Sequence, residues 1–568
     1  MKNIDVANDF DIKNLGSFYQ PDKTVFRVYA PDYENMSLVM GDRSHQMKKD
    51  KSCFEITLEG DHELAAYHYE CDGGVSFRDP FSFMSDEKDS YVLNKEKFIR
   101  SIYVPKTLKY DPIIYEVSVR DFSSDRSYTG KYRSKFLSFT ETGLKKDGCS
   151  IGLDYLKELG ISHLQLMPVF DFDNDKTDYN WGYNPIAYNY VKKDYVVNAD
   201  DPYAYINELR QAVNVLHQND IRVTLDCVFN HVYNVKTNDL GKMLKGKLYR
   251  LTSEGKLAAG TLCGSEVDTE NPFVHAYILE MIERYVYMFD IDGIRLDLMG
   301  IMGSHTVNKM CENIRTFKPD FIVYGEGWNM GDALEEEFRA TIINARKMPE
   351  IKMFNDSFRE TMIHYVSGND LIDQDVMRYI SSENEYLNSS QTINYVECHD
   401  DYTFFDRMSI FMNNEDEETI RKRCFLALAL VILSRGFPFI HSGQEFLRTK
   451  QGLRNSYNAP DKVNKLDWNL RIRNDDLVRK VEELIELRKN ITAFNANDVK
   501  ISFKTLGRIM QYQAGDISVY FNPSNDDLTY EDGLKHHVIY DDEGSCDLIK
   551  ENVFVSAHSL VICNVIPK

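Results

Sequence analysis

Apolar and polar residues follow two different periodicities along this chain. From about Leu15 to Leu93, apolar residues alternate with polar ones in short runs, and turn-forming residues separate the runs. From Asp111 onward, short apolar runs alternate with longer segments whose apolar residues recur every three or four positions. The first pattern is typical of antiparallel strands, and the second of strands that alternate with helices. The chain is therefore predicted to be all-β at its start and α/β at its centre.

The first pattern predicts an N-terminal β-sandwich over residues 1–105. Its strand candidates are residues 24–29, 37–40, 53–57 and 67–70. Short strands at such intervals pack as two facing sheets. All three tryptophans, Trp181, Trp328 and Trp468, lie beyond this region. Because it has no tryptophan platform, we expect the module mainly to pack on the next domain.

The second pattern predicts a (β/α)₈ TIM barrel over residues 106–490. Its eight strand candidates are residues 113–119, 161–169, 221–229, 293–298, 321–324, 352–355, 392–397 and 437–441. Helical periodicity marks residues 203–218, 272–289 and 306–317 between them. A doubly wound open sheet is the alternative, but no glycine-rich phosphate loop follows the first strand. We expect residues 232–270 to form an excursion over the barrel mouth.

A second all-β domain is predicted to close the chain over residues 491–568. After a helix near residues 475–488 the alternating pattern returns. The strand candidates are residues 501–503, 509–513, 517–521, 537–540 and 560–563. Their short lengths and spacing predict a C-terminal β-sandwich.

Composition limits the size, the partners and the compartment. A chain of 568 residues is too long for one hydrophobic core, so two to four domains are expected. The formal net charge of −22 repels phosphate backbones, which argues against a nucleic-acid partner. The 10 cysteines are scattered without zinc spacing, and the most apolar stretch, residues 424–434, is too short to span a bilayer. With no export signal at the start, we expect a cytoplasmic protein with free thiols and no membrane partner; the oligomeric state stays open.

Polar side chains and one tryptophan lie where the predicted barrel strands end. They are Asp226 and His231 on the third strand, Arg295 and Asp297 on the fourth, Glu326 and Trp328 on the fifth, and His399 and Asp400 on the seventh. Each one alone has an ordinary structural explanation. Because the carboxyl ends of barrel strands open at one mouth, we expect them to converge there.

This set of acids, with no metal-ligand spacing and no cofactor loop, indicates glycoside hydrolysis. That reaction needs one ionised carboxylate as the nucleophile and one protonated carboxyl group as the proton donor. Arg295 beside Asp297 is expected to lower the pKa of Asp297 and keep it ionised. Glu326, between two glycines and beside Trp328, is expected to be desolvated and to have a raised pKa. Asp400 is left to bind ring hydroxyls and favour a distorted sugar.

These residues also carry a family resemblance. Asp226 with Asn230 and His231, residues 293–297, residues 325–327, and His399 with Asp400 resemble the conserved regions of the α-amylase superfamily. The segments similar to type I pullulanases are residues 179–185, 324–328, 347–349, 354–356 and 455–458. The resemblance implies a retaining hydrolase that cleaves α-1,6 branch linkages in pullulan, branched maltodextrins or glycogen. It also implies that the N-terminal sandwich is a starch-binding-like module, for which we expect weak sugar binding at most.

The resemblance assigns roles to individual residues. Asp297 matches the nucleophile, Glu326 the acid/base and Asp400 the transition-state stabiliser. The remaining matches are Tyr183, which stacks on the sugar; His231 and His399, which bind hydroxyls; Arg295, which orients the nucleophile; and Asp226, the structural acid of the third strand. The residues expected near the cleavage point are Trp328, Asn180, Trp181 and Asn355. For Trp181, bracing of the second βα loop is an equally weighted interpretation.

Three departures from the family pattern bear on specificity. Asp401 stands where Asn is usual, Cys398 replaces a usual Ser, and residues 302–304 replace a common His-Asp pair. An α-1,4-acting or mixed-specificity amylase or isoamylase is the alternative, and a non-catalytic sugar-binding relative is disfavoured by the three intact carboxylates. No cofactor or metal site is expected. The sequence leaves a structural calcium, the preferred branch length and the natural substrate open.

Overall fold

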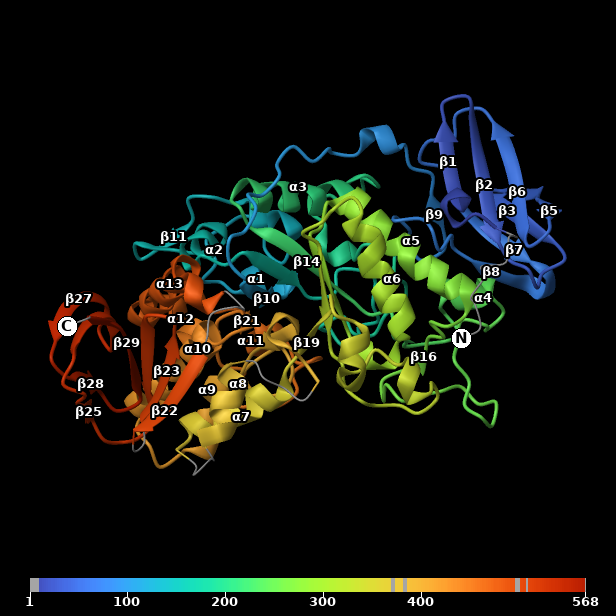
Figure 1. Ribbon diagram of the computed structural model, residues 1–568. Helices are drawn as coiled ribbons and strands as arrows, with labels where there is room; N and C mark the ends of the chain where they lie inside the picture. The colour runs from blue at the N-terminus through green and yellow to red at the C-terminus, as the bar shows by residue number, and fades with distance from the viewer. Residues whose placement is uncertain (1–9, 369–372, 382–385, 496–500, 507–508, 567–568) are drawn as a thin grey trace.

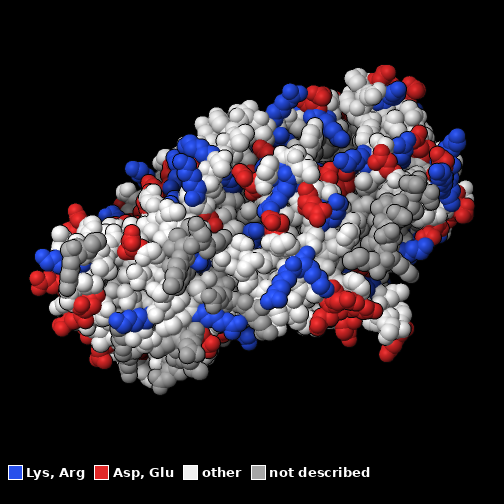
Figure 2. All heavy atoms as spheres, viewed as in Figure 1, with Lys and Arg blue, Asp and Glu red and all other residues white. Residues whose placement is uncertain are grey.

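The computed structural model describes residues 10–368, 373–381, 386–495, 501–506 and 509–566. Figure 1 shows a β-sheet module at each end of an elongated molecule, with a barrel and its helices between them. The acidic and basic side chains are interspersed over the face in Figure 2. The prediction of a central α/β barrel flanked by all-β parts is confirmed.

The barrel is a closed ring of eight parallel strands. They are β10 (Ile114–Val117), β13 (His163–Leu166), β14 (Arg222–Cys227), β17 (Gly293–Leu296), β18 (Ile322–Gly325), β19 (Lys352–Phe354), β20 (Thr392–Asn394) and β21 (Phe437–His441). Each strand pairs with the next along the chain, and β21 pairs back with β10. All eight lie within, or within one residue of, the predicted segments. Their side chains are buried on both faces, which is why these runs read as continuously apolar rather than alternating.

Helices cover the outside of the barrel. The longer ones are α3 (Ala204–Gln218), α5 (Pro272–Phe289), α6 (Ser304–Arg315), α7 (Asp356–Val366), α10 (Glu417–Leu433) and α13 (Asp475–Asn490). Helix α5 begins where Asn271 caps it ahead of a proline in its first turn, and ends at Asp290, which has a positive φ of 59°. Helix α10 carries the apolar stretch predicted to be buried, and it is buried. Among the described residues, no helix is both long enough and apolar enough to cross a bilayer.

Shorter elements complete the barrel domain. They are α1 (Val119–Ser124), β11 (Lys145–Lys146), β12 (Cys149–Ser150), α2 (Leu153–Leu159), α4 (Asp239–Met243), α8 (Asp373–Ile380), α9 (Phe404–Phe411), α11 (Asp461–Asn464) and α12 (Trp468–Arg473). In the segment predicted as an excursion, β15 (His231–Val232) pairs antiparallel with β16 (Ser265–Glu266). This pairing closes the intervening chain, including α4, as one folded loop beside the third strand.

Two antiparallel sheets form the N-terminal module. One has the order β1 (Gly16–Gln20), β2 (Lys23–Tyr29), β6 (Cys53–Glu59), β5 (Lys48–Asp50), and the other β4 (Arg43–Gln46), β3 (Met36–Met40), β7 (Ala66–Cys71), β8 (Val75–Phe77), with β9 (Ser90–Tyr91) also on β7. The four predicted strands correspond to β2, β3, β6 and β7. The strands that sequence reasoning missed include β4 and β5, which are polar edge strands without an apolar face to give an alternating pattern.

The N-terminal module packs on the barrel through helix α5 and the folded loop at α4. The ring of Tyr29 stacks on that of Phe273, with centroids 4.2 Å apart. Arg78 forms an ion pair of 2.8 Å with Asp239. The expectation that this module packs on the next domain is confirmed.

The C-terminal module is a six-stranded sheet faced by a two-stranded one. The larger sheet has the order β22 (Ile501–Leu506), β23 (Ile509–Ala514), β24 (Ile517–Asn522), β29 (Ser559–Ile566), β26 (Lys535–Asp541), β27 (Gly544–Lys550), and the smaller pairs β25 (Leu528–Tyr530) with β28 (Val553–Val555). Strands β25, β27 and β28 were not predicted. Residues 1–9, 369–372, 382–385, 496–500, 507–508 and 567–568 of the predicted domains lie outside the described residues, and the domain boundaries stay predictions.

Candidate active site

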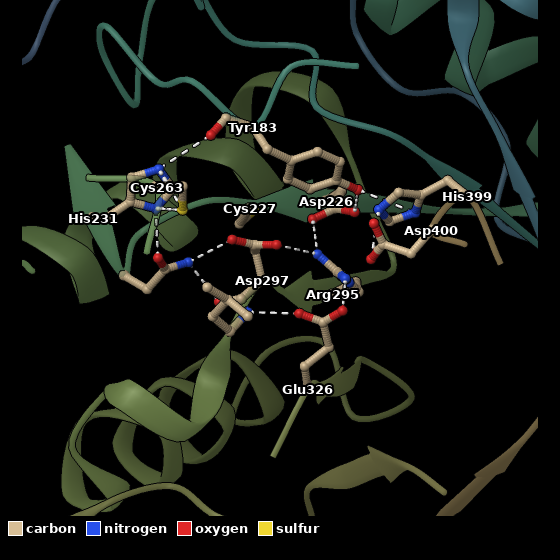
Figure 3. Close-up of polar contacts among 12 residues, drawn as sticks. Tyr183, Asp226, Cys227, His231, Cys263, Arg295, Asp297, Glu326, His399 and Asp400 are labelled. Carbon is tan, nitrogen blue, oxygen red and sulfur yellow. Dashed lines mark hydrogen bonds and ion pairs between the residues drawn. The ribbon is translucent and has the colours of Figure 1, made fainter. Parts of the chain in front are cut away.

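The site is built where β14, β17, β18 and β20 end at the barrel mouth (Figure 3). The strand register places Asp226 of β14 beside Arg295 of β17, and Arg295 beside Tyr324 of β18. Side chains two apart on a strand share a face, so Arg295 and Asp297 point the same way, as predicted. Four separate segments thereby deliver charged groups to one small space.

Arg295 is the centre of this arrangement and is only 2% exposed. Its Nη1 lies 3.1 Å from Asp226 Oδ1 and 2.9 Å from Asp297 Oδ1. Its Nη2 lies 2.6 Å from Glu326 Oε1. One buried guanidinium therefore serves three acids, and because its charge is single, it cannot balance all of them in ionised form.

Asp297 is held by donors from two different elements. Besides Arg295, the side-chain amide of Asn230 donates to Asp297 Oδ2 and to its backbone oxygen, each over 2.7 Å. These contacts fix the orientation of the carboxylate just beyond the end of β17. A carboxylate fixed in this way is suited to attack a carbon atom placed above it.

Glu326 lies beside Asp297 and is buried. Its Oε2 accepts the backbone N–H of Leu298 over 2.9 Å. Burial, followed by the nearby charges of Asp297 and Asp400, raises the pKa of Glu326 to about 8, although Arg295 works in the opposite direction. Glu326 therefore keeps its proton at neutral pH, which is the state that a proton donor needs.

Asp400 differs from the other two carboxylates because its side chain is 55% exposed. Its Oδ2 lies 3.5 Å from His399 Nε2, and its charge reaches Glu326. Figure 3 shows Asp297, Glu326 and Asp400 around Arg295. The structure thus brings the three predicted carboxylates together at one mouth.

Tyr183 and His399 form one wall of the site. Their rings stack with centroids 4.8 Å apart, and the Tyr183 hydroxyl donates to Asp226 Oδ2 over 2.7 Å. Burial raises the pKa of Asp226 to about 6, with Arg295 opposing and Asp297 adding to the rise. Asp226 thus holds the hydroxyl end of Tyr183, which agrees with a structural role for this acid.

Trp181 and Asn180 lie behind that wall and are buried. The Trp181 ring meets His399 edge-on at 5.0 Å, and its backbone N–H donates to the carbonyl of Tyr457 over 3.0 Å. Asn180 Oδ1 accepts the N–H of Gly182 over 2.9 Å. These contacts are those of a brace for the second βα loop, and contact of Trp181 with sugar stays a prediction.

Two further predicted residues are fully buried. His231 Nε2 lies 3.1 Å from the carbonyl oxygen of Tyr183, and its Nδ1 lies 2.6 Å from Asn230 Oδ1. Asn355 caps α7, where its Oδ1 accepts the N–H of Phe358 over 3.1 Å. Both residues are thus held by backbone or side-chain contacts, and neither is exposed to solvent.

Trp328 is half-buried over the aromatic group that lines the barrel interior, which includes Tyr324 and Phe354. The loop after β17 approaches its backbone closely. A Cβ atom on Gly300 would lie 1.9 Å from the Trp328 carbonyl oxygen, so only glycine fits there. The Gly300 N–H also donates to the Glu326 carbonyl oxygen over 2.9 Å, which ties the two catalytic loops together.

Sequence reasoning missed two buried groups behind His399. Glu116 on β10 accepts from the His399 ring and backbone, and Lys450 Nζ donates to the His399 carbonyl oxygen over 2.5 Å. Lys450 also lies over the Trp181 ring at 4.7 Å. An acid inside a fully buried strand was the signal that could have revealed Glu116, because such a charge needs a partner.

Two of the three departures from the family pattern have structural explanations. Asp401, at a positive φ of 65°, is 3.1 Å from Arg454 and 3.9 Å from Arg407, so its extra charge is paired. Met302 is fully buried, and the N–H of Gly303 donates to Thr269. This stretch therefore supports the start of α6. Within the described part of the chain, no group of three or more His, Cys, Asp or Glu side chains is arranged to hold a metal ion.

Comparisons with known proteins agree with this geometry. Residues 138–239 match the family described as the alpha-amylase catalytic domain. A pullulanase of Bacillus subtilis (strain 168) is 35% identical over 526 residues, which are 84% of this chain and 72% of that protein. The crystal structure of an Anoxybacillus pullulanase complexed with maltotetraose is similar, with a TM-score of 0.94 and 32% identity, over 99% of this chain and 89% of that one. A Paenibacillus barengoltzii pullulanase complexed with maltohexaose and alpha-cyclodextrin has a TM-score of 0.94 and 30% identity, over 100% and 97%.

Proposed function

Because this chain belongs to the pullulanase family of α-amylase-type glycoside hydrolases, we propose that it cleaves α-1,6-glucosidic branch linkages in α-glucans. One observation carries the catalytic part of the proposal. A single buried guanidinium holds Asp297 and Glu326 side by side, and Glu326 keeps its proton at neutral pH. The likeness to pullulanases supports the choice of linkage.

The reaction proceeds by double displacement. Asp297 attacks the anomeric carbon while Glu326 donates its proton to the leaving glycosidic oxygen, which gives a covalent glycosyl-enzyme. Glu326, now a carboxylate, takes a proton from the water that breaks this ester. Asp400 and His399 hold ring hydroxyls and favour the oxocarbenium-like transition state. The configuration of the anomeric carbon is retained, which requires close carboxyl groups; the shared contact with Arg295 supports this.

The substrate is an α-glucan with α-1,6 linkages, such as pullulan, branched maltodextrin or glycogen. Solved pullulanases similar to this chain were crystallised with maltotriose and maltotetraose. An α-1,6 bond runs through an exocyclic CH₂ group, so the two chains can meet at an angle. Tyr183, whose hydroxyl donates to Asp226, and Trp328, two residues beyond Glu326, are the aromatic residues that we assign to the walls for such a bent ligand.

The same proposal includes a cytoplasmic location. All ten cysteines are free, and Cys263 is exposed on the folded loop beside His231. Free thiols are typical of a reducing compartment. The glucans available there are glycogen outer branches and imported branched maltodextrins.

Product analysis tests the proposed linkage. Pullulan incubated with the pure enzyme is expected to give maltotriose, while amylose is left almost untouched. Panose or isopanose from pullulan would show α-1,4 cleavage and overturn the linkage. In a parallel NMR experiment the new reducing end should first appear as the α-anomer, since the β-anomer would exclude double displacement. Asp297→Asn, purified in the same way, controls for a contaminating glucanase.

A further inference from the structure

Glu116 is a buried acid that the proposed reaction does not use directly. It lies on β10, the first barrel strand, and is 1% exposed. Both of its oxygens contact His399: Oε1 accepts from the ring Nδ1, and Oε2 accepts the backbone N–H, each over 2.8 Å. A single carboxylate therefore fixes the ring and the main chain of the residue next to Asp400.

Glu116 is itself anchored from the neighbouring strand. Gln165 of β13 donates its amide to Glu116 Oε1 over 3.1 Å, and Gln165 Oε1 accepts the Tyr324 hydroxyl over 2.6 Å. Tyr324 belongs to β18, the strand that ends at Glu326. This chain of hydrogen bonds crosses the barrel interior, so the position of Glu116 depends on three strands rather than on a mobile loop.

His399 is held between two carboxylates. On one side its Nδ1 contacts Glu116, and on the other its Nε2 lies 3.5 Å from Asp400 Oδ2. Tyr183 stacks on the ring and Trp181 meets its edge, so the ring has no room to turn. A ring with a carboxylate at each nitrogen donates at both nitrogens only as imidazolium.

We propose that Glu116 is a positioning residue of this active site. It holds His399 as a charged hydrogen-bond donor, and His399 in turn fixes the position of the Asp400 carboxylate. The proposal rests on the proposed hydrolysis, because it assigns Glu116 to the support of the transition-state stabiliser. Glu116 touches no reacting atom. It acts through His399, whose other ring nitrogen, Nε2, faces the carboxylate of Asp400.

The electrostatics of His399 agree with this role. Burial lowers the pKa of His399, but Glu116 and then Asp400 raise it to a net value of about 9. The charged or titratable groups that act on His399 from the surrounding elements are Glu116, Asp226, Arg295, Asp400, His441 and Lys450, with the Tyr183 hydroxyl beside Nδ1. Arg295 opposes protonation, so Glu116 supplies the largest favourable charge.

Glu116→Gln is the decisive variant, because it keeps the shape and removes the charge. We expect kcat to fall about 10- to 100-fold, as for a slight misplacement of a catalytic group, with KM changed much less. We also expect the alkaline limb of the activity profile, which Glu326 sets at about pH 8 in wild type, to move to lower pH, since His399 in the variant then loses its proton before Glu326 does. Glu116→Asp keeps the charge but cannot span both contacts, so kcat should fall while the alkaline limb stays in place.

Glu445→Gln is the matched control. Glu445 is another buried barrel acid, and its Oε1 accepts from the Tyr115 and Tyr155 hydroxyls, away from His399. This variant is expected to change the melting temperature without moving the pH profile. If Glu116 served only the fold, Glu116→Gln would behave in the same way.

The titration of His399 separates this proposal from the proposed function. It is read by NMR of protein carrying labelled histidine, with the signal identified by its loss in His399→Asn, and it needs no substrate. We expect His399 in Glu116→Gln to titrate below its wild-type value. If His399 in Glu116→Gln titrates as in wild type and the alkaline limb also stays in place, the positioning role is overturned. If the wild-type enzyme is inactive on every α-glucan, the proposed function alone is overturned.

Discussion

Strand β17 has a cluster of buried or partly buried charges at each of its two ends, and the two clusters are built differently. The mouth cluster at its carboxyl end consists of Asp226, Arg295, Asp297 and Glu326. The base cluster at its start consists of His217, Asp290, Asp292 and Lys318. The mouth cluster has one cation for three acids, and the base cluster has two cations for two acids.

In the base cluster every charge has a partner. His217 Nε2 lies 2.7 Å from Asp292 Oδ2, and Lys318 Nζ lies 2.9 Å from Asp290 and 3.0 Å from Asp292. Burial opposes ionisation, yet the two acids raise the pKa of His217 to about 9, and His217 with Lys318 holds the pKa of Asp292 below its usual value. His217, Asp290 and Asp292 are thus all ionised at neutral pH.

The mouth cluster cannot reach that state. With a single cation to share, Glu326 stays protonated, and burial also raises the pKa of Asp226. The comparison teaches that equal numbers of cations and acids let every group ionise and stabilise the fold. A deficit of cations instead leaves one acid protonated, and the reaction can use that proton. The same strand therefore serves stability at one end and chemistry at the other.

The largest expected effect comes from removing a carboxylate of the mouth cluster. Asp297→Asn or Glu326→Gln should lower kcat by about three orders of magnitude or more, because each removes a group that acts in the transition state. The melting temperature should stay near the wild-type value, since one of several crowded acids has been neutralised. Steady-state kinetics on pullulan and thermal denaturation test both parts. Near-normal turnover in either variant would show that the roles are assigned wrongly.

A change in the base cluster should have the opposite signature. Asp292→Asn breaks a buried ion pair and should destabilise the fold by about 3–5 kcal/mol, while kcat at 25 °C is unchanged. The pKa of His217 is raised, so its contribution to stability is complete below its unfolded pKa and is lost as pH rises through about 9. Melting temperatures between pH 7 and pH 10 should therefore fall more steeply for wild type than for Asp292→Asn. Parallel curves would mean that the pair adds no pH-dependent stability.

The pH dependence of catalysis should report the mouth cluster. Because Glu326 must donate a proton and its pKa is raised to about 8, kcat/KM should fall as pH rises through about 8. Initial rates on pullulan across pH 5 to 10, corrected for the stability measured above, give this limb. A limb centred near the ordinary pKa of a glutamate would show that burial and the neighbouring acids do not hold the proton.

The smallest effect is expected at Asp401. This acid is paired with Arg454 and Arg407, so it adds little to the charge deficit of the mouth cluster. Asp401→Asn should change kcat/KM by less than about threefold, in line with the weak coupling of partly exposed ion pairs. An alkaline limb that moves with this substitution would place Asp401 within the mouth cluster and weaken the contrast with the base cluster.

Several features were predictable because they depend on local pattern. The eight barrel strands were found because buried parallel strands read as short apolar runs between helices. Asp297, Glu326 and Asp400 were found because they follow such runs. The polar edge strands β4 and β5 were missed, since an edge strand with two exposed faces has no alternating pattern.

The functions of single side chains depended on contacts between distant segments. Asn355 and Trp181 stay predicted neighbours of the sugar, and only the fold shows that the first caps a helix and that the second packs edge-on against His399. Glu116 stayed hidden because its partner lies 283 residues further along the chain. Nothing in either local sequence indicates that the two residues meet.

The sequence by itself determined which segments become strands, which acids stand at their ends and which family chemistry they match. Only the tertiary structure decided which acid keeps a proton, because the pKa of Glu326 depends on burial and on the charges of Arg295, Asp297 and Asp400 at once. Periodicity and strand-end position are local properties of the chain. Protonation and side-chain orientation are set by neighbours that the closed barrel brings together across hundreds of residues, and the balance of charge among those neighbours separates the reactive end of β17 from its structural end.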